Sequence, residues 1–282
     1  MRIAIHHTSH YQYEQPVPYA LQRLRLRPQS GPGQNVLEWR VTVDGVEPGT
    51  SWTDGFGNRA DLVRHERNKL EIVIVAAGTV ETVDMAGIYG VTYDTTPPWI
   101  YERETLLTKP GERVQALAES VRASSGQLDS LHRLMNAVHT MIVYKPGSTG
   151  VGTDAETALR DGSGVCQDHT HAFIAAARQL GVPARYISGY LLMEDVAQQS
   201  ASHAWAEAHV DGLGWVGFDA ANDTCPDDRY VRTATGLDYR DAMPVSGVRS
   251  GQGAETLTVE ISVTQVPGQS QSQSQNQSQS QN

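Results

Sequence analysis

The chain has 282 residues, with 22 basic and 32 acidic side chains and a formal net charge of −10. This acidic excess argues against a general electrostatic attraction to nucleic acid or to an anionic membrane. No apolar run approaches the roughly 18 residues that a membrane helix needs. The first residues, MRIAIHHTSHYQYEQ, lack the apolar region of a signal peptide. We therefore expect a cytoplasmic protein with no nucleic-acid and no membrane partner.

The first part of the chain has the pattern of antiparallel β-structure. Ile3 and Ile5 fall on one face of the first predicted strand, and turn signals such as Asp44-Gly45 and Pro48-Gly49 separate the later ones. Short strands at this spacing predict a β-sandwich-like domain over residues 1–95. The predicted strands span residues 2–13, 21–27, 36–43 and 69–77.

The middle of the chain, residues 96–245, combines helices with strands. Pro97 and Pro98 form a stiff connector, and Asp129 is the expected N-cap of the second helix. Asp211-Gly212 predicts a hairpin between the last two strands. Helices followed by strands in one region indicate an α+β core. Helices are predicted at residues 112–124, 128–143, 157–160 and 166–180, and strands at 184–192, 204–210 and 215–218.

The last part of the chain contains one strand and one low-complexity segment. Residues 254–266 alternate apolar and polar side chains, and this lone strand needs a sheet. We expect it to return to the sheet of the N-terminal domain. From Gln269 onward only Gln, Ser and Asn occur, so we expect residues 267–282 to be disordered.

Cys166 is the first candidate for chemistry. It follows the turn Gly162-Ser163-Gly164-Val165 and begins an alanine-rich helical stretch. A helix N-terminus favours negative charge, so a thiol in this position is biased toward the nucleophilic thiolate. A free cysteine is more often a small buried hydrophobic residue. A disulfide with Cys225 is another alternative, although a cytosolic chain usually keeps both thiols reduced.

His203 and Asp219 can supply the two other groups that thiol catalysis needs. A base must lie within reach of the thiol, and a third group must fix the tautomer of that base. His203 begins one predicted strand and Asp219 ends the next, so the hairpin can bring them together as a cross-strand pair. A surface or capping histidine and a turn aspartate are the simpler alternatives, and local sequence leaves both open.

Residues close to these three have simpler expected roles. Gln167 and Asp168 are positioned to cap the helix N-terminus, and Gln167 is also a candidate for the oxyanion site or the pocket. Cys166, His169 and His171 raise the alternative of a metal site, but on a helix the i+5 residue points about 140° away from the first. We therefore expect no metal, and packing near the pocket for His169. Trp205 is expected to form a wall of the pocket or part of the core.

Two longer segments resemble the catalytic core of the transglutaminase-like superfamily. GSGVCQDHTHAFIAAARQLGVPARYISGYL resembles its nucleophile helix, and SHAWAEAHVDGLGWVGFDAAN resembles its His-plus-Asp hairpin. The run HHTSHYQYEQPVPYALQRLRLRP, with Asp54-Gly55-Phe56-Gly57-Asn58, resembles the β domain that precedes this core in bacterial members. Tyr144-Lys145-Pro146-Gly147 and Thr149 also fit. The resemblance implies a papain-like core with Cys166 as nucleophile, His203 as base and Asp219 as the orienting group.

The resemblance implies acyl chemistry on a carboxamide of a protein or peptide substrate, through a Cys166 thioester. Water would resolve the thioester in a peptidase or amidase, and an amine would resolve it in a transglutaminase. Crosslinking members of the superfamily use a tryptophan upstream of the cysteine, and none occurs between Trp99 and Trp205. We therefore favour hydrolysis.

The remaining parts of this scheme are less specific. The Cys166 backbone N–H and Tyr144 are the expected donors to the oxyanion. The chemistry requires no metal and no cofactor. A non-enzymatic binding or assembly module on the same scaffold is the alternative from another class.

Overall fold

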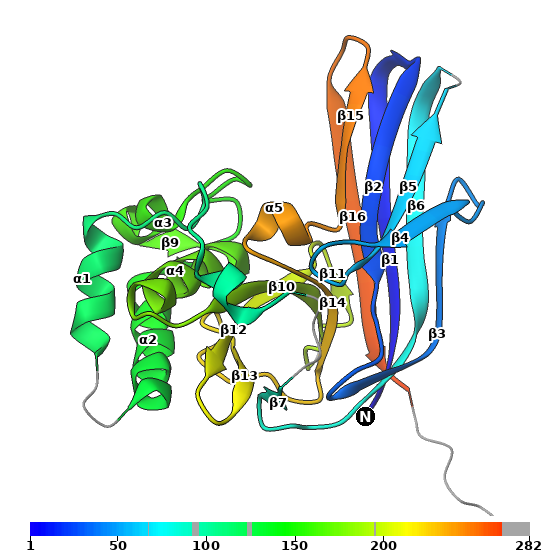
Figure 1. Cartoon of the computed structure of the whole chain (residues 1–282). Coiled ribbons are helices and arrows are strands. Elements are labelled where there is room, and N and C mark those ends of the chain that lie inside the picture. Colours follow the sequence, from blue (N-terminus) through cyan, green and yellow to red (C-terminus); the bar gives the residue numbers. More distant parts are fainter. Residues whose placement is uncertain (67, 92–95, 123–125, 195, 267–282) are drawn as a thin grey trace, which may run out of the picture.

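The computed structural model describes residues 1–66, 68–91, 96–122, 126–194 and 196–266. Helices lie on one side of the molecule, a five-stranded sheet lies in the middle, and two long sheets lie on the other side (Figure 1). This arrangement confirms the predicted α+β class.

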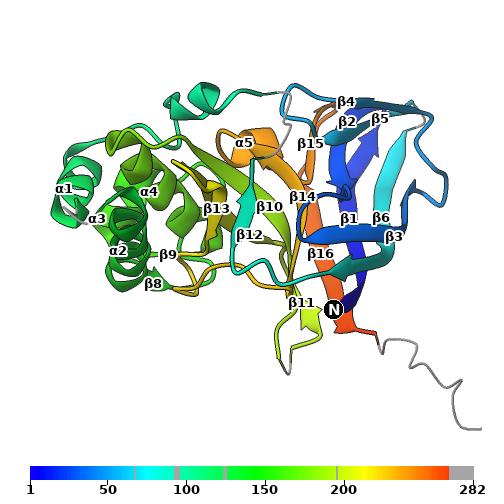
Figure 2. The same ribbon diagram turned by 60° about the horizontal axis from the view of Figure 1, so that its bottom comes forward.

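The two long sheets form the N-terminal β-structure, and both are antiparallel (Figure 2). The first has the order β11 (Gln198–Gln199), β16 (Glu255–Gln265), β1 (Arg2–Val17), β6 (Lys69–Thr82) and β3 (Gln34–Val43). The second has the order β15 (Val245–Ser250), β2 (Tyr19–Arg27), β5 (Arg59–His65) and β4 (Thr50–Thr53). The four predicted N-terminal strands are confirmed, and they lie within β1, β2, β3 and β6.

Alternation of side chains along β1 builds the inner face of the first long sheet. Ile3 and Ile5 are buried, and so are Tyr11 and Tyr13 at the other end of the strand. Ile3 and Ile5 pack with Tyr190 of the middle sheet. Tyr11 and Tyr13 pack in the cluster that contains strands of both long sheets. One strand therefore contacts both parts of the molecule.

The middle sheet, here called the core sheet, is also antiparallel and has the helices on one face. Its order is β14 (Tyr230–Gly236), β10 (Ala184–Leu191), β12 (His203–Val210), β13 (Gly214–Phe218) and β7 (Ile88–Gly90). Every residue of β10 is buried, because helical side chains cover some of its residues and the long sheets cover others. The predicted hairpin between β12 and β13 is confirmed.

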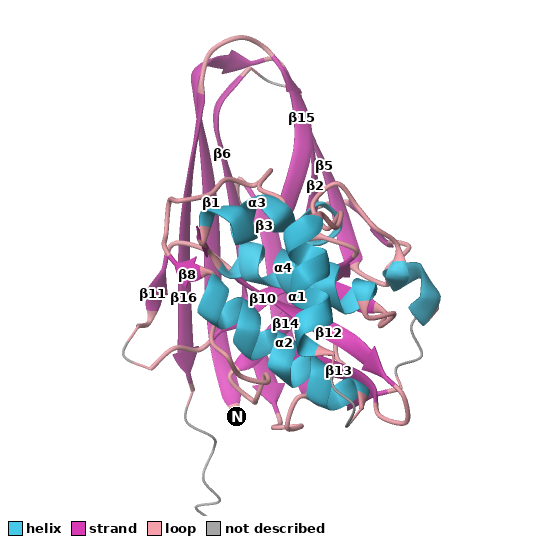
Figure 3. Ribbon diagram, turned by 90° about the vertical axis from the view of Figure 1, so that its left-hand side faces the viewer, coloured by secondary structure: helices cyan, strands magenta, loops and turns pink. Residues whose placement is uncertain are grey.

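The helices pack together on the core sheet (Figure 3). They are α1 (Glu112–Val121), α2 (Gln127–Met141), α3 (Ala155–Asp161), α4 (Cys166–Gln179) and α5 (Tyr239–Ala242), with a 3-10 helix, η1, at Pro98–Glu102. Among the described residues, no helix has both the length and the apolar character required to cross a membrane. The end of the predicted helix 112–124 falls partly on residues 123–125, outside the described residues.

One helix cap differs from the prediction. The N-cap of α2 is Gly126, with a φ of 130°, and Asp129 lies inside the first turn. The Asp129 carboxylate accepts a hydrogen bond from Arg133 at 2.9 Å, in an i, i+4 pair on the helix surface. The prediction was wrong because a glycine with an unusual φ supplies the start of the helix without a side-chain cap.

Strands from distant parts of the chain join the same sheets. β16 pairs with β1 over eleven residues, from Ile3 opposite Gln265 to Tyr13 opposite Glu255. β15 pairs with β2, whereas β7 adds to the core sheet through β13. The predicted disordered tail, residues 267–282, lies outside the described residues.

Candidate active site

The turn before Cys166 is built by two glycines with different tasks. Gly162 ends α3 with a φ of 63°, a left-handed conformation that favours glycine. At Gly164 a Cβ atom would lie 2.6 Å from the Cβ of Asp168, so only glycine fits beneath that side chain. The chain then enters α4 with Cys166 as its first residue. The thiol therefore stands at the N-terminus of a buried helix, as predicted.

The Asp168 side chain links the N-terminus of α4 to Val165 and to Thr149 by hydrogen bonds. Its Oδ2 accepts hydrogen bonds from the Val165 backbone N–H at 2.7 Å and from the Thr149 hydroxyl at 2.6 Å. Burial raises the pKa of Asp168 above its ordinary value, although both hydrogen bonds act in the opposite direction. The capping role that was predicted for this carboxylate is confirmed.

His203 and Asp219 form a buried hydrogen-bonded pair. The His203 Nε2–H donates to Asp219 Oδ2 at 2.6 Å, and both side chains are almost inaccessible to solvent. The pair is not directly cross-strand as expected. The strand register places Ala206 opposite Phe218, and the ladder ends there. Asp219 therefore reaches His203 diagonally, from the residue after β13.

Several donors hold the Asp219 carboxylate as an anion. The Asn222 side-chain amide donates to Oδ2 at 2.7 Å, and the Tyr230 hydroxyl donates to the same oxygen at 2.8 Å. The Ala221 backbone N–H donates to Oδ1 at 3.1 Å. Burial alone would raise the pKa of Asp219, but His203 and these side chains lower it below its ordinary value.

His203 carries the electrostatic signature of the site. Burial acts to lower its pKa, but the Asp219 carboxylate and a hydrogen bond with the Cys166 side chain raise the pKa of His203 to about 10. The ring is therefore an imidazolium at neutral pH. Because Asp219 occupies Nε2, the ring nitrogen left for Cys166 is Nδ1. The geometry can pair a cationic ring with a sulfur anion.

Tyr144, the predicted second oxyanion donor, lies close enough to Cys166 to interact with it electrostatically. It lies on β8 (Val143–Tyr144), which pairs in parallel with β9 (Ser163–Gly164) just before Cys166. Burial and the charges of Cys166 and Asp219 raise the pKa of Tyr144 above its ordinary value. Its half-exposed phenol therefore keeps its proton at neutral pH and can donate a hydrogen bond.

The other predicted pocket residues bond to backbone carbonyls or pack against His203. His169 bridges two backbone carbonyls, with Nδ1 2.8 Å from Val165 O and Nε2 2.8 Å from Ile142 O. Gln167 donates to the Val151 carbonyl at 3.4 Å. Trp205 is buried and lies parallel to the His203 ring, with the ring centroids 6.2 Å apart.

The residues of the alternative metal site and of the alternative disulfide have other contacts or are free. Both nitrogens of His169 face carbonyl oxygens, and His171 Nε2 accepts a hydrogen bond from the Tyr239 backbone N–H at 3.2 Å. Within the described part of the chain, no three His, Cys, Asp or Glu side chains are grouped to hold a metal. Cys166 and Cys225 are both free thiols.

Sequence reasoning missed Tyr230 and Asn222. Asn222 lies three residues after Asp219, in a turn where an isolated amide carries no special signal. Tyr230 lies on β14, and its contact with Asp219 depends on the tertiary structure. Its ring packs edge-on against Trp205, with the ring centroids 5.3 Å apart. No local pattern in the sequence predicts this contact.

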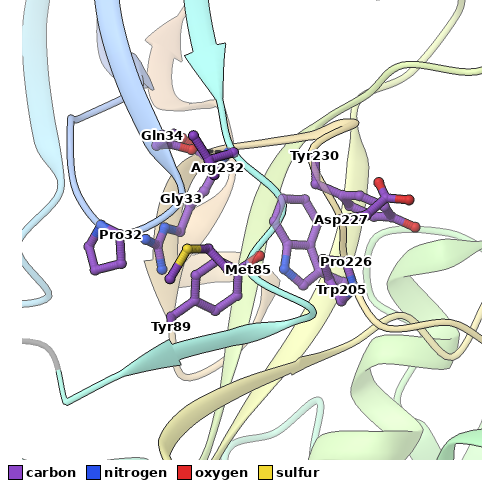
Figure 4. Close-up of a pocket in the computed structure, with 11 residues that line it drawn as sticks. Pro32, Gly33, Gln34, Met85, Tyr89, Trp205, Pro226, Asp227, Tyr230 and Arg232 are labelled. Atoms are coloured by element: carbon purple, nitrogen blue, oxygen red, sulfur yellow. Dashed lines mark hydrogen bonds between the residues drawn. The ribbon is translucent and has the colours of Figure 1, made fainter. Parts of the chain in front are cut away.

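A small cavity lies between the N-terminal β-structure and the core sheet (Figure 4). Trp205 and Tyr230 form one wall, and Gly33 and Met85 belong to the opposite side. The cavity has a volume of about 10 Å³, enough for about one water molecule. The cavity is therefore an internal gap, not a substrate pocket.

Comparison with known proteins identifies both parts of the chain. Residues 115–220 match the family model of the transglutaminase-like superfamily, and residues 3–81 match the bacterial transglutaminase-like N-terminal region. The chain therefore carries a transglutaminase-like core and a bacterial transglutaminase-like N-terminal region.

Relatives and a solved structure share nearly the whole length. An uncharacterized protein of Mycobacterium leprae is 27% identical over 94% of this chain and 99% of its own length. An uncharacterized protein of Mycobacterium tuberculosis is 27% identical over 94% of this chain and 93% of its own length. A crystal structure from Cytophaga hutchinsonii, named a "Putative Cysteine Protease", has a TM-score of 0.74 at 21% identity and covers 95% of this chain and 91% of that one. This likeness confirms the predicted transglutaminase-like fold.

Proposed function

We propose that the protein is a thiol hydrolase that cleaves a carboxamide bond of a protein or peptide through a Cys166 thioester. The observation that carries this proposal is the buried His203–Asp219 pair, with its Nε2–Oδ2 distance of 2.6 Å, next to a thiol at a helix N-terminus. A scaffold without chemistry gains nothing from a buried imidazolium held against a cysteine, because burying charge costs free energy.

The first half-reaction forms the thioester. The Cys166 sulfur, with its proton held by His203, attacks the carbonyl carbon, and a C–S bond forms as the carbonyl oxygen becomes an oxyanion. The C–N bond then breaks, and the His203 imidazolium gives its proton to the departing amine. Asp219 keeps Nε2 protonated, so Nδ1 performs both proton transfers.

The second half-reaction releases the acyl group. Water attacks the thioester carbon while His203, now neutral, takes the proton from that water. The C–S bond breaks, the carboxylic acid leaves, and the sulfur anion and the imidazolium are restored. An amine in place of water would give a transglutaminase reaction with the same residues.

Donors for the oxyanion lie at the start of α4 and on β8. The Cys166 N–H is at the first position of the helix, where a backbone N–H has no intrahelical partner. The phenol of Tyr144 is the second proposed donor. Such donors stabilise the charge that develops on the carbonyl oxygen in the transition state.

The test is a peptide library offered with and without a primary amine, scored by mass spectrometry for hydrolysis and for amine incorporation. The parent should hydrolyse members of the library, and Cys166→Ala should abolish turnover. Cys225→Ala is the matched control and should retain activity. Full activity of Cys166→Ala in this assay would contradict the proposal.

Other outcomes assign the alternatives. Amine incorporation in excess of hydrolysis would make the protein an acyltransferase. Absence of any turnover, together with no covalent Cys166 adduct of a peptide-amide probe, would make it a binding or assembly module. A protein or peptide as substrate and a cytoplasmic location stay predictions from the sequence.

A further inference from the structure

The strand that carries Tyr230 lies at the edge of the core sheet. Among the described strands, β14 pairs with β10 alone. An edge strand presents a row of unpaired backbone N–H and C=O groups, and buried groups of this kind need partners. On the free side of β14 the partners come from side chains of the N-terminal β-structure.

Gln34, at the start of β3, supplies the first partner. Its side-chain amide donates to the Arg232 carbonyl at 3.0 Å, and its Oε1 accepts from the Arg232 N–H at 2.9 Å. The two bonds reproduce the pair that a neighbouring strand would make. The Gln34 amide also donates to the Gln29 carbonyl at 2.7 Å, which fixes its orientation. Figure 4 shows Gln34 beside Arg232 at the cavity.

Asn58 supplies the second partner in the same way. Its side-chain amide donates to the Thr235 carbonyl at 2.7 Å, and its Oδ1 accepts from the Thr235 N–H at 2.7 Å. Asn58 is almost fully buried. Asp54 accepts a hydrogen bond from the same amide at 3.2 Å and forms an ion pair with Arg25 at 2.8 Å. The amide is thus held rigidly before β14.

A bulge in β14 explains why residues three apart both face outward. Along β10, Ser188 lies opposite Ala234 and Gly189 lies opposite Arg232, so Thr233 is the extra residue. The Thr233 hydroxyl donates to the Ser188 carbonyl at 2.8 Å and anchors the bulge. Arg232 and Thr235 consequently turn the same backbone edge toward the N-terminal β-structure.

We propose that Gln34 and Asn58 are positioning residues for the reaction, because they act as a missing strand that fixes β14 and so holds the Tyr230 hydroxyl on Asp219. Arg232 is two residues from Tyr230, and the Tyr230 hydroxyl is 2.8 Å from Asp219 Oδ2. The bacterial transglutaminase-like N-terminal region is therefore part of the catalytic unit. This inference rests on the proposed role of Asp219 in orienting His203.

The experiment measures the rate of alkylation of Cys166 by iodoacetamide as a function of pH. All variants carry Cys225→Ala, so that Cys166 is the thiol that reacts. The variants are Gln34→Ala, Tyr230→Phe and the double variant, with Asn35→Ala as the matched control on the exposed neighbour of Gln34. Gln34→Glu is a second variant, which keeps the acceptor for the Arg232 N–H and loses the donor. Urea unfolding of each variant measures stability separately.

Tyr230→Phe removes a donor that positions the Asp219 carboxylate, so the His203 imidazolium should be held less firmly beside Cys166 and the acid limb of the alkylation profile should move to higher pH. Gln34→Ala should move the limb in the same direction and slow alkylation about three- to tenfold, and the double variant should add little, because both act on one network. Asn58→Ala should behave like Gln34→Ala. Gln34→Glu should shift the limb less than Gln34→Ala, and Asn35→Ala should leave the profile unchanged.

Two results would overturn the inference. In the first, Gln34→Ala and Gln34→Glu lower the urea midpoint and leave the alkylation profile at the parent position. In the second, the effects of Gln34→Ala and Tyr230→Phe on the profile are fully additive. The assay needs no substrate, so its outcome is independent of turnover. Coupled profiles together with no cleavage of any peptide would count against the proposed hydrolase and would leave the positioning role standing.

Discussion

At the scale of single residues, the charge on His203 governs the behaviour of the site. The raised pKa of His203, about 10 against an ordinary 6.5, means that the ring stabilises the folded state below about pH 6.5 and loses this contribution as the pH rises through 10. The lowered pKa of Asp219 contributes stability above the ordinary carboxyl value of 3.8 and loses it as the pH falls.

The first prediction follows from these two signs. Asp219→Asn should lower kcat by about 10⁴-fold, because the neutral amide no longer holds the imidazolium and its tautomer. The loss in free energy of unfolding relative to the parent should be largest between about pH 4 and 6.5 and should shrink on both sides. Urea unfolding at several pH values measures it. A difference that grows toward pH 10 would contradict the assignment of the charged pair.

A second prediction concerns the oxyanion. Tyr144→Phe removes one hydroxyl, so kcat should fall about 10²- to 10³-fold with little change in KM, as expected for a donor that acts in the transition state. Tyr19→Phe, in the N-terminal β-structure, is the matched control. Steady-state kinetics on a cleaved library peptide measures both values. A kcat of Tyr144→Phe equal to that of the parent would contradict the role of Tyr144 as an oxyanion donor.

The residues themselves show how far the sequence could be interpreted. Cys166, His203 and Asp219 were visible because thiol chemistry demands three residue types and because long motifs surround them. Tyr230 was invisible because its contact depends on where an edge strand lies in three dimensions. The direct cross-strand pairing of His203 and Asp219 was wrong by a diagonal step, because Val210 lies opposite Gly214 across the turn and this register does not place His203 opposite Asp219.

At the scale of elements, the N-terminus of α4 depends on the loop that precedes α3. Thr149 reaches from this loop to Asp168, and Gln167 reaches back to the loop carbonyl of Val151. The loop and the helix therefore close around Cys166 together. The sequence located α4 to within one residue, because glycines before it and an alanine-rich stretch after it give strong signals.

The third prediction tests this connection. Thr149→Val keeps the shape of the side chain and removes the donor to Asp168, so the free energy of unfolding should fall by about 1–3 kcal/mol. Ser148→Ala is the control, because its hydroxyl is exposed and bonds only locally to the Lys145 carbonyl. Its change should stay within about 0.5 kcal/mol. Urea denaturation compares them, and equal losses in both variants would contradict a specific role for Thr149.

At the scale of the whole molecule, the strands do not separate into independent halves. β7 adds to the core sheet, β11 adds to a long sheet, and one apolar cluster contains Ile3, Tyr190 and Val231 from both parts. Turn signals and alternation predicted β1, β2, β3, β6, β10, β12, β13 and β16, whereas β4, β5, β14 and β15 were missed. The short strands β7 and β11 could not be predicted, because two or three residues carry no periodicity.

The fourth prediction is therefore a single cooperative unfolding transition. Far-UV circular dichroism, which reports mainly on the sheets and helices, and tryptophan fluorescence should give coincident urea curves. Trp39 and Trp52 lie in the N-terminal β-structure, while Trp205 and Trp215 lie in the core sheet. Asn58→Ala should move both curves together to lower urea. Two separated transitions would show that the parts unfold independently.

The amide-covered side of β14 has one more consequence. A bare sheet edge can recruit the same edge of a second molecule and so begin aggregation. Gln34 and Asn58 occupy the backbone groups of Arg232 and Thr235 that such recruitment would use. A chain that lacks both amides would keep these backbone groups buried against the N-terminal β-structure without hydrogen-bond partners, at a cost in free energy.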